Sequence, residues 1–169
     1  MPNSNTPTLA NTLFITSYGL QIGTFEVVKE IFSFIESKPN ERYKIIIGTD
    51  SEKLSTNYAD FVTAIVVHRV GNGGRYFWRR NEFGKFHTLR DRIIKEVMLS
   101  LEVAKEVLSE LKKNSAFSNW DFEIHADVGE NGATNVLIQE VVGMIRANNF
   151  EVRTKPESYA ASKVADRHV

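Results

Sequence analysis

The sequence contains no cysteine among its 169 residues. This absence excludes disulfide bonds, zinc sites built on thiolates and thiol nucleophiles, so any bound metal must be held by oxygen or imidazole ligands. A net charge is also absent, because basic and acidic residues number 21 each. Bulk charge therefore does not draw the chain to nucleic acid, and such a partner must be bound by a local patch. No apolar run approaches the length that spans a membrane.

Size and composition indicate one folded domain. A chain of this length with 42% hydrophobic residues can bury one core but is short for two. Residues 1–12 (MPNSNTPTLANT) are polar and lack the basic and apolar blocks of a signal peptide, and we expect them to be disordered. We therefore expect a single domain over residues 13–169 in a soluble cytoplasmic protein without a membrane partner.

The spacing of apolar residues predicts a mixed α/β fold. The glycine-rich turn at 71–74 predicts a hairpin and hence antiparallel pairing among the first three strands. The later strands are joined through helices, which favours parallel pairing. In chain order we expect a helix over 24–37, strands over 44–50, 61–70 and 75–80, a helix over 89–111, a strand over 122–128, a helix over 134–148, a strand over 151–154 and a helix over 158–167.

Four acidic residues stand where this arrangement can bring them together. Asp50 and Asp127 follow apolar strands, and reactive groups collect beyond the carboxyl ends of parallel strands. Glu96 lies near the edge of the apolar stripe of the long helix, and Asp166 lies near the end of the last helix. Carboxylates without thiolates form a hard-oxygen site of the kind that holds Mg²⁺ or Mn²⁺.

The segment from 69 to 92 alternates basic and aromatic side chains. Guanidinium groups beside aromatic rings suit phosphates and bases, so the segment is a candidate surface for a nucleic-acid strand. The alternative interpretation of this segment is a charged edge strand whose aromatic residues fill the core. Lys155 and Lys163 near the acids are further candidates for phosphate contacts. The residues that we expect to bind substrate are Arg75, Arg79, Arg80, Trp78, Lys155 and Lys163.

Four stretches of the chain surround these acids: IGTDSE around Asp50, RIIKEV around Glu96, IHADVGENG around Asp127 and KPESYAASKVAD, which ends at Asp166. They resemble the ribonuclease H-like superfamily and, within it, the YkuK-like family of bacterial proteins. The resemblance spans about residues 25–168. It implies a five-stranded mixed sheet of three antiparallel strands and two parallel additions, flanked by helices and preceded by one extra N-terminal helix.

The resemblance implies a nuclease that hydrolyses phosphodiesters with two divalent ions, Mg²⁺ or Mn²⁺. Asp50 would bridge both ions, Glu96 and Asp127 would hold one, and Asp166 would hold the other. RNA or an RNA/DNA hybrid is the expected substrate, and the products would carry a 3′-hydroxyl and a 5′-phosphate.

Other interpretations of the same residues stay open. Asp50 can cap a turn, Glu96 can be a solvated helix residue, Asp166 can pair with Lys163, and His125 can be a structural hydrogen bonder. A non-catalytic nucleic-acid or protein-binding module would keep the fold without turnover. A dimeric junction resolvase would use the same acids on DNA. Nucleotide phosphate binding of the sugar-kinase type is disfavoured, because it needs two such domains and a glycine after the first acid.

Overall fold

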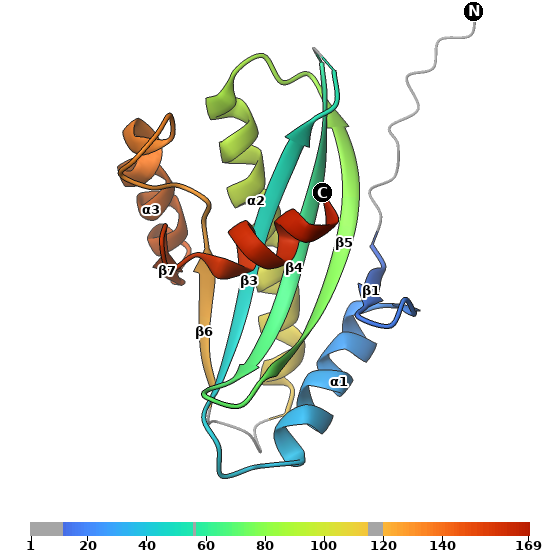
Figure 1. Ribbon diagram of the computed structural model, residues 1–169. Coiled ribbons are helices and arrows are strands. Elements are labelled where there is room, and N and C mark those ends of the chain that lie inside the picture. Colours follow the sequence, from blue (N-terminus) through green and yellow to red (C-terminus); the bar gives the residue numbers. More distant parts are fainter. Residues whose placement is uncertain (1–11, 56, 115–119) are drawn as a thin grey trace, which may run out of the picture.

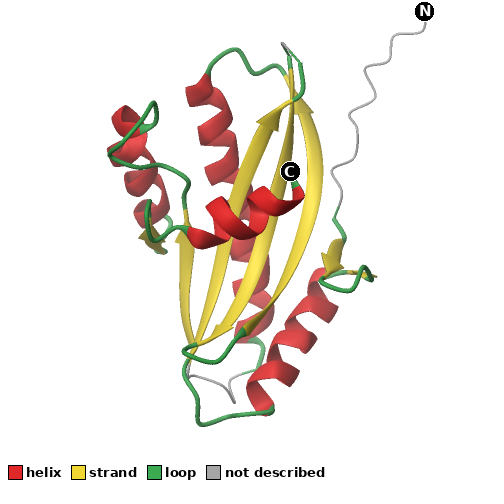
Figure 2. Cartoon of the chain, in the orientation of Figure 1, coloured by secondary structure: helices red, strands yellow, loops and turns green. Residues whose placement is uncertain are grey.

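The computed structural model describes residues 12–55, 57–114 and 120–169, without the side chains of residues 161, 162 and 166. Within these residues it is an α/β fold around one mixed sheet (Figures 1 and 2). The expectation of a disordered N-terminus concerns residues that, apart from residue 12, lie outside these ranges. The strands are β1 (Phe14–Thr16), β2 (Gln21–Ile22), β3 (Tyr43–Lys53), β4 (Tyr58–Arg69), β5 (Gly74–Gly84), β6 (Trp120–His125) and β7 (Glu151–Arg153).

Helical segments lie on both faces of the sheet. The α-helices are α1 (Thr24–Glu36), α2 (Leu89–Lys112) and α3 (Ile138–Ala147), and short turns are η1 (Asn135–Leu137), η2 (Ala160–Ala165) and η3 (Asp166–His168). Among the described residues no helix is long and apolar enough to cross a membrane.

The strand order is β2-β1-β5-β4-β3-β6-β7. β3, β4 and β5 pair antiparallel, whereas β6 pairs parallel to β3 and β7 parallel to β6. The glycine turn makes the predicted hairpin between β4 and β5, where Gly71 and Gly73 adopt φ values of +79° and +78° that favour glycine. β3 lies near the centre of the sheet because both of its faces are apolar, and Ile45 and Ile46 are each 0% exposed on opposite sides.

One face of the sheet packs against the long helices. α1 and α2 bury their apolar stripes against Ile45, Ile47, Ile65 and Phe77 in the main core cluster. α2 begins after Thr88, whose hydroxyl accepts a hydrogen bond from the Asp91 amide at 3.1 Å. This cap confirms the helix start that the sequence predicts.

The other face carries the C-terminal segment. η2 and η3 cross in front of β3, β4 and β5 (Figure 1). Ala160 packs there against Ile46 and Val66, and Ala165 packs against Val62 and Ala64. The chain thus ends over the same face to which the even-numbered side chains of β3 point.

The mixed sheet is confirmed, but the strand count and the last helix differ from expectation. The described residues form seven strands instead of five, because the short strands β1 and β2 extend the sheet beyond β5, where Ile15 is the partner of Trp78. The helix expected over 158–167 is present as a π-helix over Ala160–Ala165 followed by a 3-10 helix over Asp166–His168. The strands β1 and β2, of three and two residues, are too short to show a period, which is why the sequence pattern missed them.

Candidate active site

Asp50 lies near the end of β3 on the face that carries the C-terminal segment. In the antiparallel register Asp50 is opposite Val62, and Val62 is opposite Arg80 on β5. Cross-strand partners share a face of the sheet, so Asp50 and Arg80 point to the same side. Asp50 Oδ1 also accepts a hydrogen bond from the Ser51 amide at 2.9 Å. The strand therefore fixes the direction of the carboxylate.

Asp127 follows the last residue of β6, parallel to β3. Gly48 is the partner of His125, so Asp50 and Asp127 each lie two residues beyond a matched pair. The backbone around Asp127 is held on both sides, because Ala126 N donates to Arg153 O at 2.9 Å and Lys155 N donates to Val128 O at 2.8 Å. The adjacent parallel strands that the sequence suggested are present, and they bring the two acids to one edge of the sheet.

Glu96 reaches the same edge from α2. Its side chain is only 5% exposed, and Ser51 Oγ donates a hydrogen bond to Glu96 Oε1 at 2.5 Å. Burial raises the pKa of the Glu96 carboxyl well above its usual range, and the nearby Asp50 and Asp127 carboxylates raise it further. Glu96 is therefore not a solvated helix residue but the third member of one electrostatic cluster.

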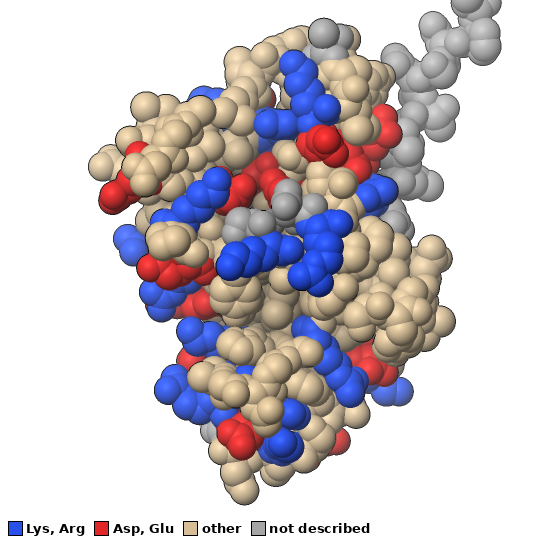
Figure 3. Space-filling model, viewed as in Figure 1, with Lys and Arg blue, Asp and Glu red and all other residues tan. Residues whose placement is uncertain are grey.

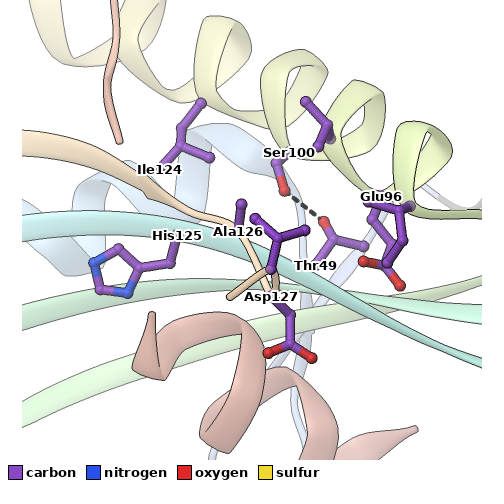
Figure 4. A pocket seen from close by; sticks show the side chains of 10 residues that line it. Thr49, Glu96, Ser100, Ile124, His125, Ala126 and Asp127 are labelled. Atoms are coloured by element: carbon purple, nitrogen blue, oxygen red, sulfur yellow. Dashed lines mark hydrogen bonds between the residues drawn. The ribbon is translucent and has the colours of Figure 1, made fainter. Parts of the chain in front are cut away.

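A small cavity lies between α2 and the strand ends that carry these acids (Figure 4). Glu96 and Asp127 line it together with the Thr49 hydroxyl, which lies 2.7 Å from Ser100 Oγ. The cavity volume is about 10 Å³, room for about one water molecule. The cavity is therefore too small to hold a nucleotide.

The carboxylate oxygens of this cluster are of the type that binds a hard divalent cation, although in this structure they contact protein side chains. Among the described residues no three acidic or histidine side chains are grouped as a metal cage. Glu96 is bound to Ser51, and Lys155 Nζ lies 3.1 Å from Asp127 Oδ1. That buried oxygen has the charge of Lys155 beside it but no hydrogen bond. A carboxylate oxygen without a hydrogen bond, next to two further carboxylates, fits the requirements of a Mg²⁺ or Mn²⁺ ligand.

Lys155 reaches Asp127 because residue 129 is a glycine. A Cβ atom at Gly129 would lie 2.8 Å from the Lys155 Cβ, closer than such atoms approach. Any larger residue at 129 would therefore push the lysine away from the acid.

The fourth predicted acid, Asp166, has its side chain outside the described residues. Its backbone begins η3, directly after the π turn that packs on β3 and β4. Lys163 lies in that π turn and is exposed. The backbone of the last acid thus lies on the face to which Asp50 points.

The basic and aromatic residues of β5 divide between the two faces. Arg75 and Arg79 point toward the helices: Arg75 pairs with Glu30, and Arg79 is 4% exposed beside Glu102 and Glu106. The structure does not bring these two predicted substrate contacts to the acids, because side chains alternate along a strand. The buried Arg79 is therefore part of the core and of its own ion pairs.

Trp78 and Arg80 lie on the face of Asp50, where acidic side chains stand among basic ones (Figure 3). Both have protein partners: the His168 ring stacks on Trp78 at 4.3 Å, and Arg80 Nε lies 3.1 Å from Asp60 Oδ2. Arg80 also donates to the His168 carbonyl. The C-terminal segment thus occupies the ring and the cation that the sequence assigned to substrate.

Two buried polar residues of β6 were not assigned a function from the sequence. Glu123 is 5% exposed and His125 is 1% exposed, and Glu123 Oε1 lies 2.9 Å from His125 Nε2. The hydrogen bond from His125 lowers the pKa of Glu123. The alternation of polar and apolar residues along β6 predicted that Glu123 and His125 share one face of the sheet. Their burial could not be predicted, because it comes from the C-terminal segment that packs on this face.

Comparison with known proteins gives a family and one relative. A family model described as Ribonuclease H-like matches residues 26–169. A Bacillus subtilis (strain 168) protein described as uncharacterized protein YkuK is 31% identical over 165 residues, which covers 92% of this chain and 95% of that protein. No solved structure matches the chain.

Proposed function

This chain belongs to the ribonuclease H-like family, and from that premise we propose that it is a divalent-metal-dependent phosphodiester hydrolase acting on nucleic acid. One observation carries the proposal. Glu96, from α2, has a pKa raised by burial and by Asp50 and Asp127, from β3 and after β6. Three acids from separate elements thus share one edge of the sheet, and such a concentration of like charge favours a bound cation.

The residues at this edge have distinct tasks in the proposed reaction. Asp50, Glu96, Asp127 and Asp166 would hold the divalent ions, the roles that the family resemblance implies for these four acids. Bound Mg²⁺ or Mn²⁺ would stabilise the charge that develops on the attacking and leaving oxygens. Ser51 orients the Glu96 carboxylate, and the backbone bonds from Arg153 and Lys155 keep Asp127 in place.

The substrate contacts fall on the C-terminal face. Lys155 and Lys163 are exposed there and suit phosphates, whereas Trp78 and Arg80 already contact His168 of the same chain. We propose RNA or an RNA/DNA hybrid as substrate, because the family suggests a nuclease and the exposed lysines suit a phosphate backbone. Arg75 and Arg79 have no part in this surface.

The proposal is tested by cleavage of an end-labelled panel with Mg²⁺ or Mn²⁺: single-stranded RNA, RNA/DNA hybrid, single- and double-stranded DNA, and a four-way junction. We expect cleavage of RNA or hybrid and a loss of at least about 100-fold in Asp50→Asn, because carboxylates hold the ions that stabilise the transition state. Asp121→Asn is the matched control, since Asp121 is exposed and pairs only with Arg42 at 3.4 Å among the contacts described. Equal activity in both variants would contradict the proposal.

A second candidate function is a binding module that keeps the metal site without turnover. The Lys155 contact with Asp127 and the Ser51 contact with Glu96 favour it, because an ion arrangement that supports turnover would have to replace these protein contacts. Binding of Mn²⁺ and of RNA by a wild type that cleaves no member of the panel would support this candidate. Preferred cleavage of the junction by a dimer would instead identify a resolvase.

A further inference from the structure

His125 is buried on the acid-bearing face, and the proposed hydrolysis assigns it no step. It lies two residues before Asp127, at the last position of β6. Its ring bridges two elements, since Nδ1 accepts a hydrogen bond from Ala160 N at 3.2 Å and Nε2 lies 2.9 Å from Glu123 Oε1. A backbone N–H can only donate, so Nδ1 carries no proton and Nε2–H donates to Glu123. The contacts therefore select one neutral tautomer.

The Ala160 amide is the first of the π turn η2, and the first N–H groups of a helical segment have no acceptor within that segment. An imidazole from β6 supplies the missing acceptor. The bond thus joins the segment that carries Lys163 and Asp166 to the strand that leads into Asp127.

Neighbouring groups hold the imidazole in this orientation. Arg153 Nε lies 3.5 Å from Glu123 Oε2 and fixes the carboxylate that accepts from His125. The Tyr159 ring meets the His125 ring edge to face at 4.7 Å, and its hydroxyl lies 3.4 Å from His68 Nδ1. β6, β7, β4 and the C-terminal segment thus all contribute to the position of one ring.

We propose that His125 is a positioning residue that docks the C-terminal segment and thereby sets the place of its acid relative to Asp127. The proposal rests on the proposed hydrolase function, because the separation of metal-binding acids matters only if they share ions. A partner that orients a metal ligand typically changes metal affinity or activity by about 10–100-fold when it is removed.

Two variants separate the hydrogen bond from the packing of the ring. His125→Asn keeps an acceptor oxygen near the position of Nδ1 but loses the donor to Glu123. His125→Phe keeps a ring of similar shape and loses both. We expect the Ala160 amide to exchange hydrogen at least about 10-fold faster in His125→Phe, with partial protection in His125→Asn.

Metal binding and turnover give two further measurements. Mn²⁺ affinity, followed by electron paramagnetic resonance, should fall about 10-fold or more in His125→Phe and less in His125→Asn. The value of kcat should fall by a similar factor and KM should rise less, because Lys163 lies on the docked segment whereas the other proposed phosphate contact, Lys155, lies outside it. Wild-type Mn²⁺ affinity and wild-type Ala160 exchange in His125→Phe would overturn the inference, as would equal losses in the two variants.

The tautomer of His125 can be measured on the wild-type protein, so this test does not depend on the folding of a variant. Long-range ¹H–¹⁵N spectra of the His125 ring should show an unprotonated Nδ1 and a protonated Nε2, and a protonated Nδ1 would overturn the inference. If the wild type cleaves no substrate, the proposed hydrolase fails, whereas amide exchange and Mn²⁺ affinity still decide whether His125 docks the segment.

Discussion

The two faces of the sheet are covered in different ways. Toward the helices, α1 and α2, which are 13 and 24 residues long, pack their buried sides into one large apolar core. Toward the candidate site, the turns η2 and η3 contribute six and three residues, and small apolar clusters alternate with hydrogen-bonded polar groups. The difference shows that the helix face supplies stability through burial, whereas the other face holds a short segment through specific polar contacts.

The largest expected effect comes from neighbouring isoleucines that face opposite ways. Ile45 belongs to the core under the helices and Ile46 to the cluster under Ala160, and both are 0% exposed. Substitution of a buried isoleucine by alanine costs about 2–5 kcal/mol. We expect Ile45→Ala near the upper end, and Ile46→Ala near the lower end because a short turn can settle into the space. Urea unfolding measures both, and equal losses would contradict the comparison.

Glu96 should make the stability of the metal-free protein depend on pH. Because its pKa is raised in the folded state, the folded protein holds the proton more tightly than the unfolded chain does. The free energy of unfolding should therefore fall as pH rises from about 4.5 toward the raised pKa.

Glu96→Gln is the variant that tests this dependence, since an amide oxygen can still accept from Ser51. In chelator we expect the variant to be more stable than wild type at pH 7–8, and the gain to shrink toward pH 5. Mn²⁺ should stabilise the wild type more than the variant. Urea unfolding at several pH values checks the trend, and a gain that grows toward low pH would contradict it.

The smallest expected effect concerns the phenol of Tyr159. Tyr159→Phe removes the hydroxyl beside His68 and leaves the ring against His125, so the free energy of unfolding should fall by about 0.5–1.5 kcal/mol. Burial raises the pKa of Tyr159 to about 12, so the phenol should titrate in the wild type at high pH and be missing from the titration of the variant. Ultraviolet difference titration measures it, and a phenol that ionises near pH 10 would contradict its burial.

Much of the helix-covered face could be predicted from the sequence, because apolar residues recur at a regular spacing along long strands and helices. The runs around Ile45 and Val66 and the stripe of α2 defined the central strands and the long helix within a few residues. The meeting of Glu96 with Asp50 and Asp127 also followed from strand ends and helix spacing.

The other face was harder to predict, because its contacts join residues far apart in the chain. Nothing local shows that His168 stacks on Trp78 or that His125 accepts from Ala160. The expected surface on β5 was assigned as one patch although alternation along a strand places Arg79 and Arg80 on opposite faces.

The ion pair of Lys155 with Asp127 would affect which cation binds at the proposed metal site. The ammonium is a tethered counter-ion, so a cation bound at Asp127 would have to compete with its charge. A monovalent ion would exchange one positive charge for another and gain little, whereas a divalent ion would bring additional charge to a group of three acids. In the proposed site Lys155 would thus favour a divalent over a monovalent ion.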